Sequence, residues 1–185
     1  WMTASEVVHP VNAEHRDLIS EPFSVVPALH PPPEDVENFG TVTATLAAEA
    51  IRIDDRTQQN AAFQFPIEAQ PLTALLTFEI ANPRIDVPPE VYVNGQNIGP
   101  VALTLPELAD PGLRGESEPL TTEMHFSYTG WLRAQKLVPA TILKVGANDL
   151  VIANGVGTGA SAIRATQVQL KYIWDKSDYL LRTGN

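Results

Sequence analysis

The chain has 185 residues, of which 44% are apolar, and this composition supports one domain of ordinary size with a hydrophobic core. It contains no cysteine, so a disulfide scaffold, a thiolate metal site and a cysteine nucleophile are excluded. Acidic residues outnumber basic ones by 22 to 12, and the net charge of -10 argues against a nucleic-acid partner. The apolar runs are far shorter than the roughly 18 residues of a membrane span. We expect no membrane span.

Residues 1–38 differ from the rest of the chain in their proline content, with His9-Pro10, Glu21-Pro22, Val26-Pro27 and three prolines after His30. Proline removes a backbone donor and biases the preceding residue toward extended conformations. The sequence therefore predicts an extended, Pro-rich N-terminal arm over 1–38 and one domain over 39–185. The arm also carries apolar residues near 23–26, and we expect that part to dock on the domain.

From Gly40 onward, apolar residues alternate with polar ones, which is typical of strands with one buried face. In the segment 72–80, for example, five apolar residues share one face, with Thr73, Thr77 and Glu79 opposite. Prolines, glycines and asparagines separate these segments, and no long helix is indicated. The pattern predicts an all-β, antiparallel sandwich of about eight or nine strands. The predicted strands are 41–46, 51–53, 61–67, 72–80, 90–93, 96–103, 124–132, 149–153 and 167–174.

Two turn motifs support this prediction. Asn94-Gly95 stands between two apolar segments, and both residues tolerate a positive φ, which favours a tight hairpin. The segment 139–146 begins with Pro and ends with Gly, which predicts a short helical turn before the strand at 149–153.

These motifs together resemble the galactose-binding-domain-like family, a jelly-roll β-sandwich found in carbohydrate-binding modules and in accessory domains of glycoside hydrolases. The matching pieces are Val91-Tyr92-Val93-Asn94-Gly95, Val138-Pro139 and the run Leu143-Lys144-Val145-Gly146-Ala147-Asn148-Asp149-Leu150-Val151-Ile152. The resemblance covers residues 40 to 175. It implies an antiparallel jelly roll that binds sugar on a sheet face or on variable loops. Because those sites vary within the family, the resemblance does not identify the ligand-binding residues of this sequence. Fold alone does not imply function.

The segment 124–133 is the most informative for ligand binding. Unbroken alternation predicts Met124, Phe126, Tyr128 and Leu132 inward and His125, Ser127, Thr129, Trp131 and Arg133 on the outer face. An indole beside a guanidinium and an imidazole can stack on a sugar ring and bond to its hydroxyls. Two alternatives stay open: Gly130 marks a bulge that turns Trp131 into the core, or the arm covers this face. The candidate ligand-binding residues are Trp131, Arg133 and His125.

Acidic residues crowd the stretch 104–123, and members of the resembled family often carry a structural calcium ion. The spacing of a calcium-binding loop is absent, so a solvated loop is the favoured interpretation, and Asp54-Asp55 more simply forms a turn. We predict no metal site and no cofactor, with calcium as the alternative. The acidic residues are Glu107, Asp110, Glu116, Glu118 and Glu123.

Residues 155–160 match the dinucleotide pattern G-x-G-x-x-A, which needs a helix that starts at the glycines inside a βαβ unit. The following residues return to period two, so a flexible hairpin loop is the better interpretation. Ser161 lacks the second glycine of a G-x-S-x-G nucleophile motif. Three of the four histidines lie in the arm, and distant carboxylate pairs remain an open alternative for catalysis.

The sequence therefore predicts a non-catalytic carbohydrate-binding module, not an enzyme, of a larger secreted or cell-surface protein. The expected ligand is a neutral polysaccharide, because the net charge repels anionic polymers. Because the chain begins Trp1-Met2, we expect it to be a piece of a longer protein with neighbouring domains as partners. The alternative is a structural or interaction domain that packs against sister domains or copies of itself. A hydrolase whose carboxylates meet only in the fold is the third class.

Overall fold

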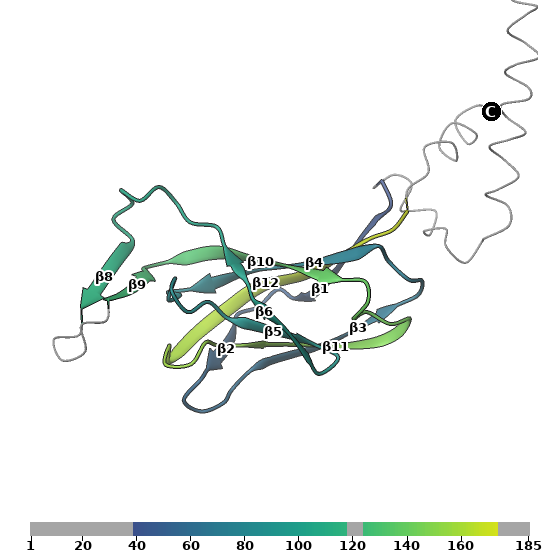
Figure 1. The fold of residues 1–185 in the computed structure, drawn as a ribbon, viewed down its shortest axis with the longest axis horizontal. Coiled ribbons are helices and arrows are strands. Elements are labelled where there is room, and N and C mark those ends of the chain that lie inside the picture. Colours follow the sequence, from purple (N-terminus) through teal and green to yellow (C-terminus); the bar gives the residue numbers. More distant parts are fainter. Residues whose placement is uncertain (1–38, 118–123, 174–185) are drawn as a thin grey trace, which may run out of the picture. The chain divides into compact units, whose positions relative to one another are not determined.

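The computed structural model describes residues 39–117 and 124–173, and the predicted arm over 1–38 lies outside the described residues. All strands of the described residues belong to one compact unit, Thr41–Lys171 (Figure 1). Within the described ranges no helix is long and apolar enough to cross a membrane. The strands are β1 (Thr41–Ala47), β2 (Ile51–Asp54), β3 (Ala61–Ile67), β4 (Thr73–Ala81), β5 (Glu90–Val93), β6 (Gln96–Pro100), β7 (Ala102–Leu103), β8 (Leu113–Ser117), β9 (Met124–Tyr128), β10 (Trp131–Pro139), β11 (Gly146–Ala153) and β12 (Ala160–Lys171).

The strands form two larger sheets and one two-stranded ribbon. The six-stranded sheet has the order β1-β12-β4-β10-β7, with β2 also paired to β12, and the four-stranded sheet has the order β3-β11-β5-β6. The ribbon consists of β8 and β9 and extends from one end of the sandwich (Figure 1). Every pairing is antiparallel. The predicted all-β antiparallel sandwich is thus confirmed.

The described residues contain twelve strands, more than the sequence predicts. The predicted segment 96–103 divides into β6 and β7, and the predicted segment 124–132 divides into β9 and β10. Gly130, whose φ is 128°, separates the latter two strands in a conformation that glycine adopts easily. β8 was not predicted because its sequence, Leu-Arg-Gly-Glu-Ser, shows no apolar alternation.

The core lies between the two larger sheets and follows the predicted alternation. In β4, the alternate residues Ala74, Leu76, Phe78 and Ile80 are buried, whereas Leu72 precedes the strand and is exposed. Burying one such large apolar side chain contributes roughly 1.5–3 kcal/mol, so this alternation is the main source of the sandwich's stability. The four-stranded sheet contributes the buried residues Phe65, Ile67, Val91, Val93, Leu150 and Ile152.

The Asn94-Gly95 turn joins β5 to β6 as the sequence predicts. Asn94 has a φ of 50° and Gly95 a φ of 79°, the pair of positive values that a two-residue type I′ hairpin requires. The segment after β10 contains two successive turns, closed by bonds of 3.2 Å from Ile142 N to Pro139 O and from Leu143 N to Ala140 O. The predicted short helical turn is therefore present as two overlapping turns.

The side chain of Asn148, with an exposed fraction of 0%, joins these two turns to β11. Its Oδ1 accepts hydrogen bonds from Asn94 Nδ2 at 2.9 Å and from Lys144 N at 3.0 Å. Its Nδ2 donates to Lys144 O at 2.7 Å and to Gly146 O at 3.0 Å. The amide of Asn148 therefore uses both of its donor hydrogens and both acceptor positions.

Asn94 extends this network across the hairpin. Its Nδ2 also donates to Ile142 O at 2.9 Å, and its Oδ1 accepts a bond from Asp149 N at 3.0 Å. The two asparagines of the resemblance motif thus hold the hairpin, the turns and the start of β11 together. Their place in the sequence is explained by fold rather than by ligand binding.

We predict that Asn148→Ala lowers the free energy of unfolding by about 3 kcal/mol, because it removes a buried side chain together with its four hydrogen bonds to Asn94, Lys144 and Gly146. Urea unfolding at neutral pH measures this loss. Gln64→Ala is the matched control, since it removes only the exposed bond from Gln64 Nε2 to Asp149 and should cost less than about 0.5 kcal/mol. Equal losses for the two variants would contradict the role given to Asn148.

Candidate functional site

β10 presents the predicted residues Trp131 and Arg133 on the outer face of the six-stranded sheet. Leu132 lies between these two residues, Ala134 follows Arg133, and both are buried. In contrast, Arg133 is exposed and the exposed fraction of Trp131 is 36%. The alternative in which a bulge at Gly130 turns Trp131 into the core is therefore wrong.

The prediction that Met124 and Phe126 point inward is also wrong, because their exposed fractions are 63% and 47%. The alternation is not continuous through this segment. β9 leaves the six-stranded sheet and pairs with β8, and the chain bends at Gly130 before β10 begins. The predicted alternation of inward and outward side chains therefore holds for β10 and not for β9.

The indole of Trp131 is held by an arginine from a strand far away in the sequence. The Cζ atom of Arg164, on β12, lies 3.9 Å from the centroid of the Trp131 ring. Arg164 Nε in turn donates to Glu79 Oε2, on β4, at 2.6 Å. This chain of contacts fixes the guanidinium against one face of the indole, and cation–π attraction of this kind contributes about 0.5–1 kcal/mol at exposed sites.

The strand register arranges the outward side chains in rows across the sheet, because cross-strand partners share a face. One row consists of Arg164, Glu79 and Arg133 on β12, β4 and β10. The row on one side of it contains Ala162, Ala81 and Trp131, whose two alanines leave room for the indole. The row on the other side is polar and contains Gln167, Thr77 and Gln135.

A β-bulge in β12 shapes this face. Arg164 pairs with Glu79 and Gln167 pairs with Thr77, so two residues of β12, Ala165 and Thr166, stand opposite the single residue Phe78. Ala165 is exposed and has a φ of 51°, which is unusual for a residue with a side chain. Thr166 points inward, and its buried Oγ1 lacks a hydrogen-bond partner among the described residues. An orphaned buried hydroxyl costs about 1–3 kcal/mol.

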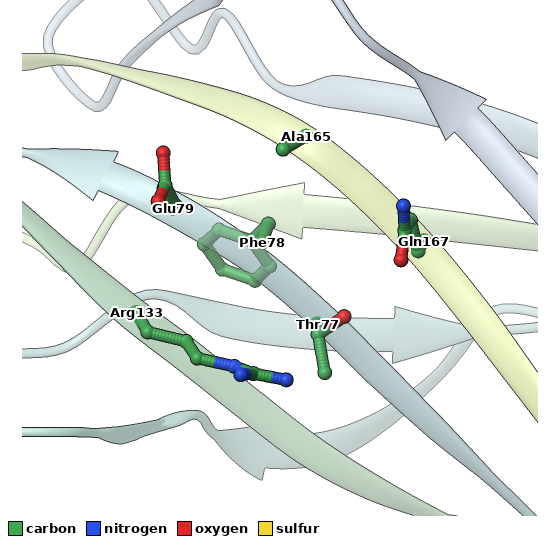
Figure 2. Close-up of a pocket in the computed structure, with 6 residues that line it drawn as sticks. All are labelled: Thr77, Phe78, Glu79, Arg133, Ala165 and Gln167. Atoms are coloured by element: carbon green, nitrogen blue, oxygen red, sulfur yellow. The ribbon is translucent and has the colours of Figure 1, made fainter.

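An open depression of about 230 Å³ lies beside the bulge (Figure 2). The small residues Ala165 and Thr77 lower the surface there, and the Arg133 side chain extends along the sheet in the direction of Thr77 (Figure 2). Among the described residues, the guanidinium of Arg133 makes no ion pair or hydrogen bond, in contrast to that of Arg164. The residues that line the depression are Thr77, Phe78, Glu79, Arg133, Ala165 and Gln167.

The structure does not bring His125 into this row. His125 lies on β9, in the two-stranded ribbon, where its Nδ1 is within hydrogen-bond distance of Arg84 Nη2. Arg84 also forms an ion pair with Asp86, whose Oδ2 lies 3.6 Å from the same ring nitrogen.

This cluster helps to attach the ribbon to the sandwich. The segment 82–86 pairs with β9 through Ile85 N to Phe126 O at 2.8 Å and Tyr128 N to Pro83 O at 3.0 Å. The hydrogen bond from Arg84 holds the pKa of Asp86 below its usual value of 3.8, against a smaller opposing effect of burial. Asp86 is therefore ionised at neutral pH and draws part of its stabilisation from Arg84.

The glycine-rich segment after β11 holds one of the protein's own carboxylates. Gly157 N donates to Asp55 Oδ2 at 2.6 Å and Gly159 N donates to Asp55 Oδ1 at 2.5 Å. These are backbone donors of the kind that bind a phosphate in a dinucleotide fold, and here Asp55 occupies them. The predicted loop is present, but the prediction of a hairpin is wrong, because it connects β11 in one sheet to β12 in the other.

Two of the acidic candidates for calcium, Asp54 and Asp110, are engaged in local hydrogen bonds. Asp54 bonds to Arg52 Nη2 at 2.9 Å and to Arg56 N at 3.1 Å, and the hydrogen bond from Arg52 lowers its pKa. Asp110 Oδ1 accepts a bond from Gly112 N at 2.7 Å. Residues Glu118 and Glu123 lie outside the described ranges. No group of three or more His, Asp or Glu residues in the described ranges is placed to hold a metal ion.

Glu79 and Arg164 belong to this site, although no sequence motif marks either residue. A signal was present in β12, because the sequence places the apolar residues Ile163 and Val168 an odd number of residues apart, and the structure buries both. Strict alternation cannot bury both, so the pattern itself indicates a bulge between them. The pairing of Arg164 with Glu79 across 85 positions was not visible without the register.

No protein-family model matches the chain, and no curated protein matches its sequence. Among similar solved structures is a β-porphyranase of glycoside hydrolase family 86 from the human gut bacterium Bacteroides plebeius, 18% identical with a TM-score of 0.42. The similarity covers 73% of this chain and 21% of that protein.

A second similar structure is the catalytic domain of a family 87 α-1,3-glucanase in complex with nigerose, 9% identical with a TM-score of 0.24. It is matched over 71% of this chain and 29% of its own length. The similarity is to parts of these glycoside hydrolase structures, and the chain spans less than a third of either one. These similarities assign no family.

We predict that Asp86→Asn lowers the free energy of unfolding by about 1 kcal/mol at neutral pH, because it removes the charged partner of Arg84. A carboxyl whose folded-state pKa is lowered stabilises the fold above its usual value of 3.8, and the effect is lost as pH falls through the lower folded-state value. Urea unfolding in a series of buffers down to about pH 2.5 should therefore show the wild type and the variant converging. A difference that persists in acid would mean that Asp86 acts by packing alone. Glu68→Gln, in an exposed segment, is the control for loss of a carboxylate.

Proposed function

We propose that this chain is a non-catalytic carbohydrate-binding module of the galactose-binding-domain-like type, within a larger secreted or cell-surface protein. The glycan lies across the outer face of the six-stranded sheet, over β4, β10 and β12. The observation that carries this proposal is the partly exposed indole of Trp131 in the row next to Arg133, which lines an open depression. An aromatic ring for stacking next to directional donors is the combination that sugar binding needs.

The dimensions of the site favour one unit of a polymer over an enclosed small molecule. The depression of about 230 Å³ is smaller than the roughly 300–1,000 Å³ of a typical small-molecule pocket, and it is open to solvent. Thr77 and Gln167 offer a hydroxyl and an amide to sugar hydroxyls. Because Arg164 covers one face of the indole, a sugar ring stacks on the opposite face or on the ring edge.

The carboxylate content of the depression supports binding rather than cleavage. Glycoside hydrolysis uses two carboxyl groups on either side of the scissile bond. The residues that line the depression include a single carboxylate, Glu79, and it is bonded to Arg164. The net charge of -10 slows the approach of strongly anionic polymers at long range, and on contact a glycan would use Trp131 for stacking and the polar row for hydrogen bonds.

We predict that Trp131→Ala weakens glycan binding by about 30-fold, equivalent to the roughly 2 kcal/mol of an aromatic anchor. A glycan array identifies a ligand, and titration calorimetry with that ligand measures the loss. The melting temperature should fall by only about 2–4 °C, because the ring is half-exposed and the contact with Arg164 is worth no more than about 1 kcal/mol.

The control for this experiment is Tyr92→Ala, which removes an aromatic side chain from the outer face of the four-stranded sheet and should leave binding unchanged. The proposal fails if no glycan binds the wild type. The site assignment fails if Trp131→Ala binds normally, or if its binding falls only in proportion to a large loss of stability.

The second candidate function is an interaction domain, and the β8–β9 ribbon is the observation that favours it. Met124 and Phe126 lie on one face of β9 and are exposed, opposite Ser117 and Gly115 of β8. Exposed large apolar side chains that cluster in this way are typical of protein contacts.

On this second hypothesis, the wild type associates with concentration and the double variant Met124→Ser, Phe126→Ser remains a monomer. Light scattering over a concentration series distinguishes the two proteins. A wild type that is monomeric throughout the series would remove self-association as a function.

A further inference from the structure

The charge of the six-stranded sheet is opposite in sign to that of the whole chain. Its strands contain five cationic residues and two anionic residues, a net charge of +3, whereas the chain carries -10. The residues outside this sheet therefore carry -13. The cations are Arg52, Arg133, Lys136, Arg164 and Lys171, and the anions are Asp54 and Glu79.

Most of these charges already have partners. Arg52 pairs with Asp54 at 2.9 Å, and Arg164 pairs with Glu79 at 2.6 Å. Lys136 Nζ donates to Pro100 O at 2.9 Å. The Arg133 guanidinium, in contrast, lines the depression and has no partner among the described residues. The row of Arg164, Glu79 and Arg133 thus carries a net +1, and the uncompensated charge is that of Arg133.

The negative charge elsewhere acts weakly at this position. The Debye length at physiological ionic strength is about 8 Å, and the two sheets of a sandwich are already about 10 Å apart. The carboxylates Glu90 and Asp149, on the outer face of the four-stranded sheet, are therefore largely screened from a ligand on the other side. The local charge of the six-stranded sheet decides which ligand is favoured on contact.

We propose that the glycan bound at this face carries an anionic group, either a carboxylate or a sulfate ester on a sugar unit, and that Arg133 binds that group. This inference rests on the proposed function and specifies its ligand class. A guanidinium offers a planar pair of donors that matches the oxygens of a carboxylate or sulfate, and such charge-assisted bonds are about twice as strong as neutral ones. Trp131, one row away, stacks on the same or the adjacent sugar unit.

The test uses two pairs of polymers that differ only in charge. Polygalacturonate and its methyl ester compare a carboxylate with a neutral ester, and carrageenan and its desulfated form compare a sulfate ester with a hydroxyl. Titration calorimetry should give about ten-fold tighter binding to the charged member of at least one pair. The difference should shrink as sodium chloride rises from about 0.05 M to about 0.5 M.

Variants of Arg133 connect this preference to the site. Arg133→Gln should remove the preference, with about a ten-fold loss on the charged polymer and little change on the neutral one. Arg133→Lys should keep part of it, because the charge remains and the paired donors are lost. Arg114→Gln, which removes an exposed arginine of the β8–β9 ribbon, should change neither polymer's binding.

The outcomes separate this inference from the proposed function. Tighter binding to the charged polymer in the carboxylate pair alone assigns a uronic acid as the ligand unit. Tighter binding in the sulfate pair alone assigns a sulfated sugar, and tighter binding in both pairs means that Arg133 accepts either anion. Equal binding within both pairs overturns the anionic ligand but leaves the proposed carbohydrate-binding function standing. Binding to neutral glycans alone, if it depends on Trp131, has the same consequence. An equal loss on charged and neutral polymers in Arg133→Gln also overturns it. Absence of binding to every glycan removes both.

Discussion

The buried amide of Asn148 is the constraint on which the arrangement of the two sheets depends. It lies in β11, just after the chain crosses from the six-stranded to the four-stranded sheet, and it bonds to Lys144 in that crossing and to Gly146 at the start of β11. Through Asn94 it also fixes the β5–β6 hairpin. A fully satisfied buried amide specifies one geometry, because any displacement leaves polar groups without partners. The two asparagines therefore fix the connection through which the chain leaves β10 and enters β11.

The candidate site is a consequence of how β12 satisfies the core. Ile163 and Val168 both pack inward, which requires one extra residue between them. That bulge turns Arg164 and Ala165 outward in succession, so it supplies both the arginine that contacts Trp131 and the low surface of the depression. It also carries the positive φ of Ala165 and the unpartnered hydroxyl of Thr166. Local strain that persists in a well-packed sheet is typical of functional positions.

Local patterns predicted most of the fold, and long-range pairing determined the rest. The Asn94-Gly95 hairpin and the buried face of β4 follow from turn chemistry and period two, which depend only on neighbouring residues. The outward positions of Trp131 and Arg133 were predicted by the same rule. The pairing of β9 with β8 was not predicted, because apolar alternation shows which face of a strand is buried and not which strand is its partner. The contact of Glu79 with Arg164 required the register of two distant strands, and the local charge of the sheet required knowing which strands lie together.

The contacts around Trp131 bear directly on affinity. A free tryptophan on a sheet surface would lose side-chain freedom when a sugar stacks on it, and this loss opposes binding. Here Arg164 holds the indole at 3.9 Å and is itself held by Glu79 at 2.6 Å, so much of that freedom is already lost in the unbound protein. Glu79 also neutralises Arg164, which leaves Arg133 as the uncompensated charge of its row. One ion pair therefore orients the stacking surface and leaves the guanidinium beside the depression as the cation of this row that is open to a ligand.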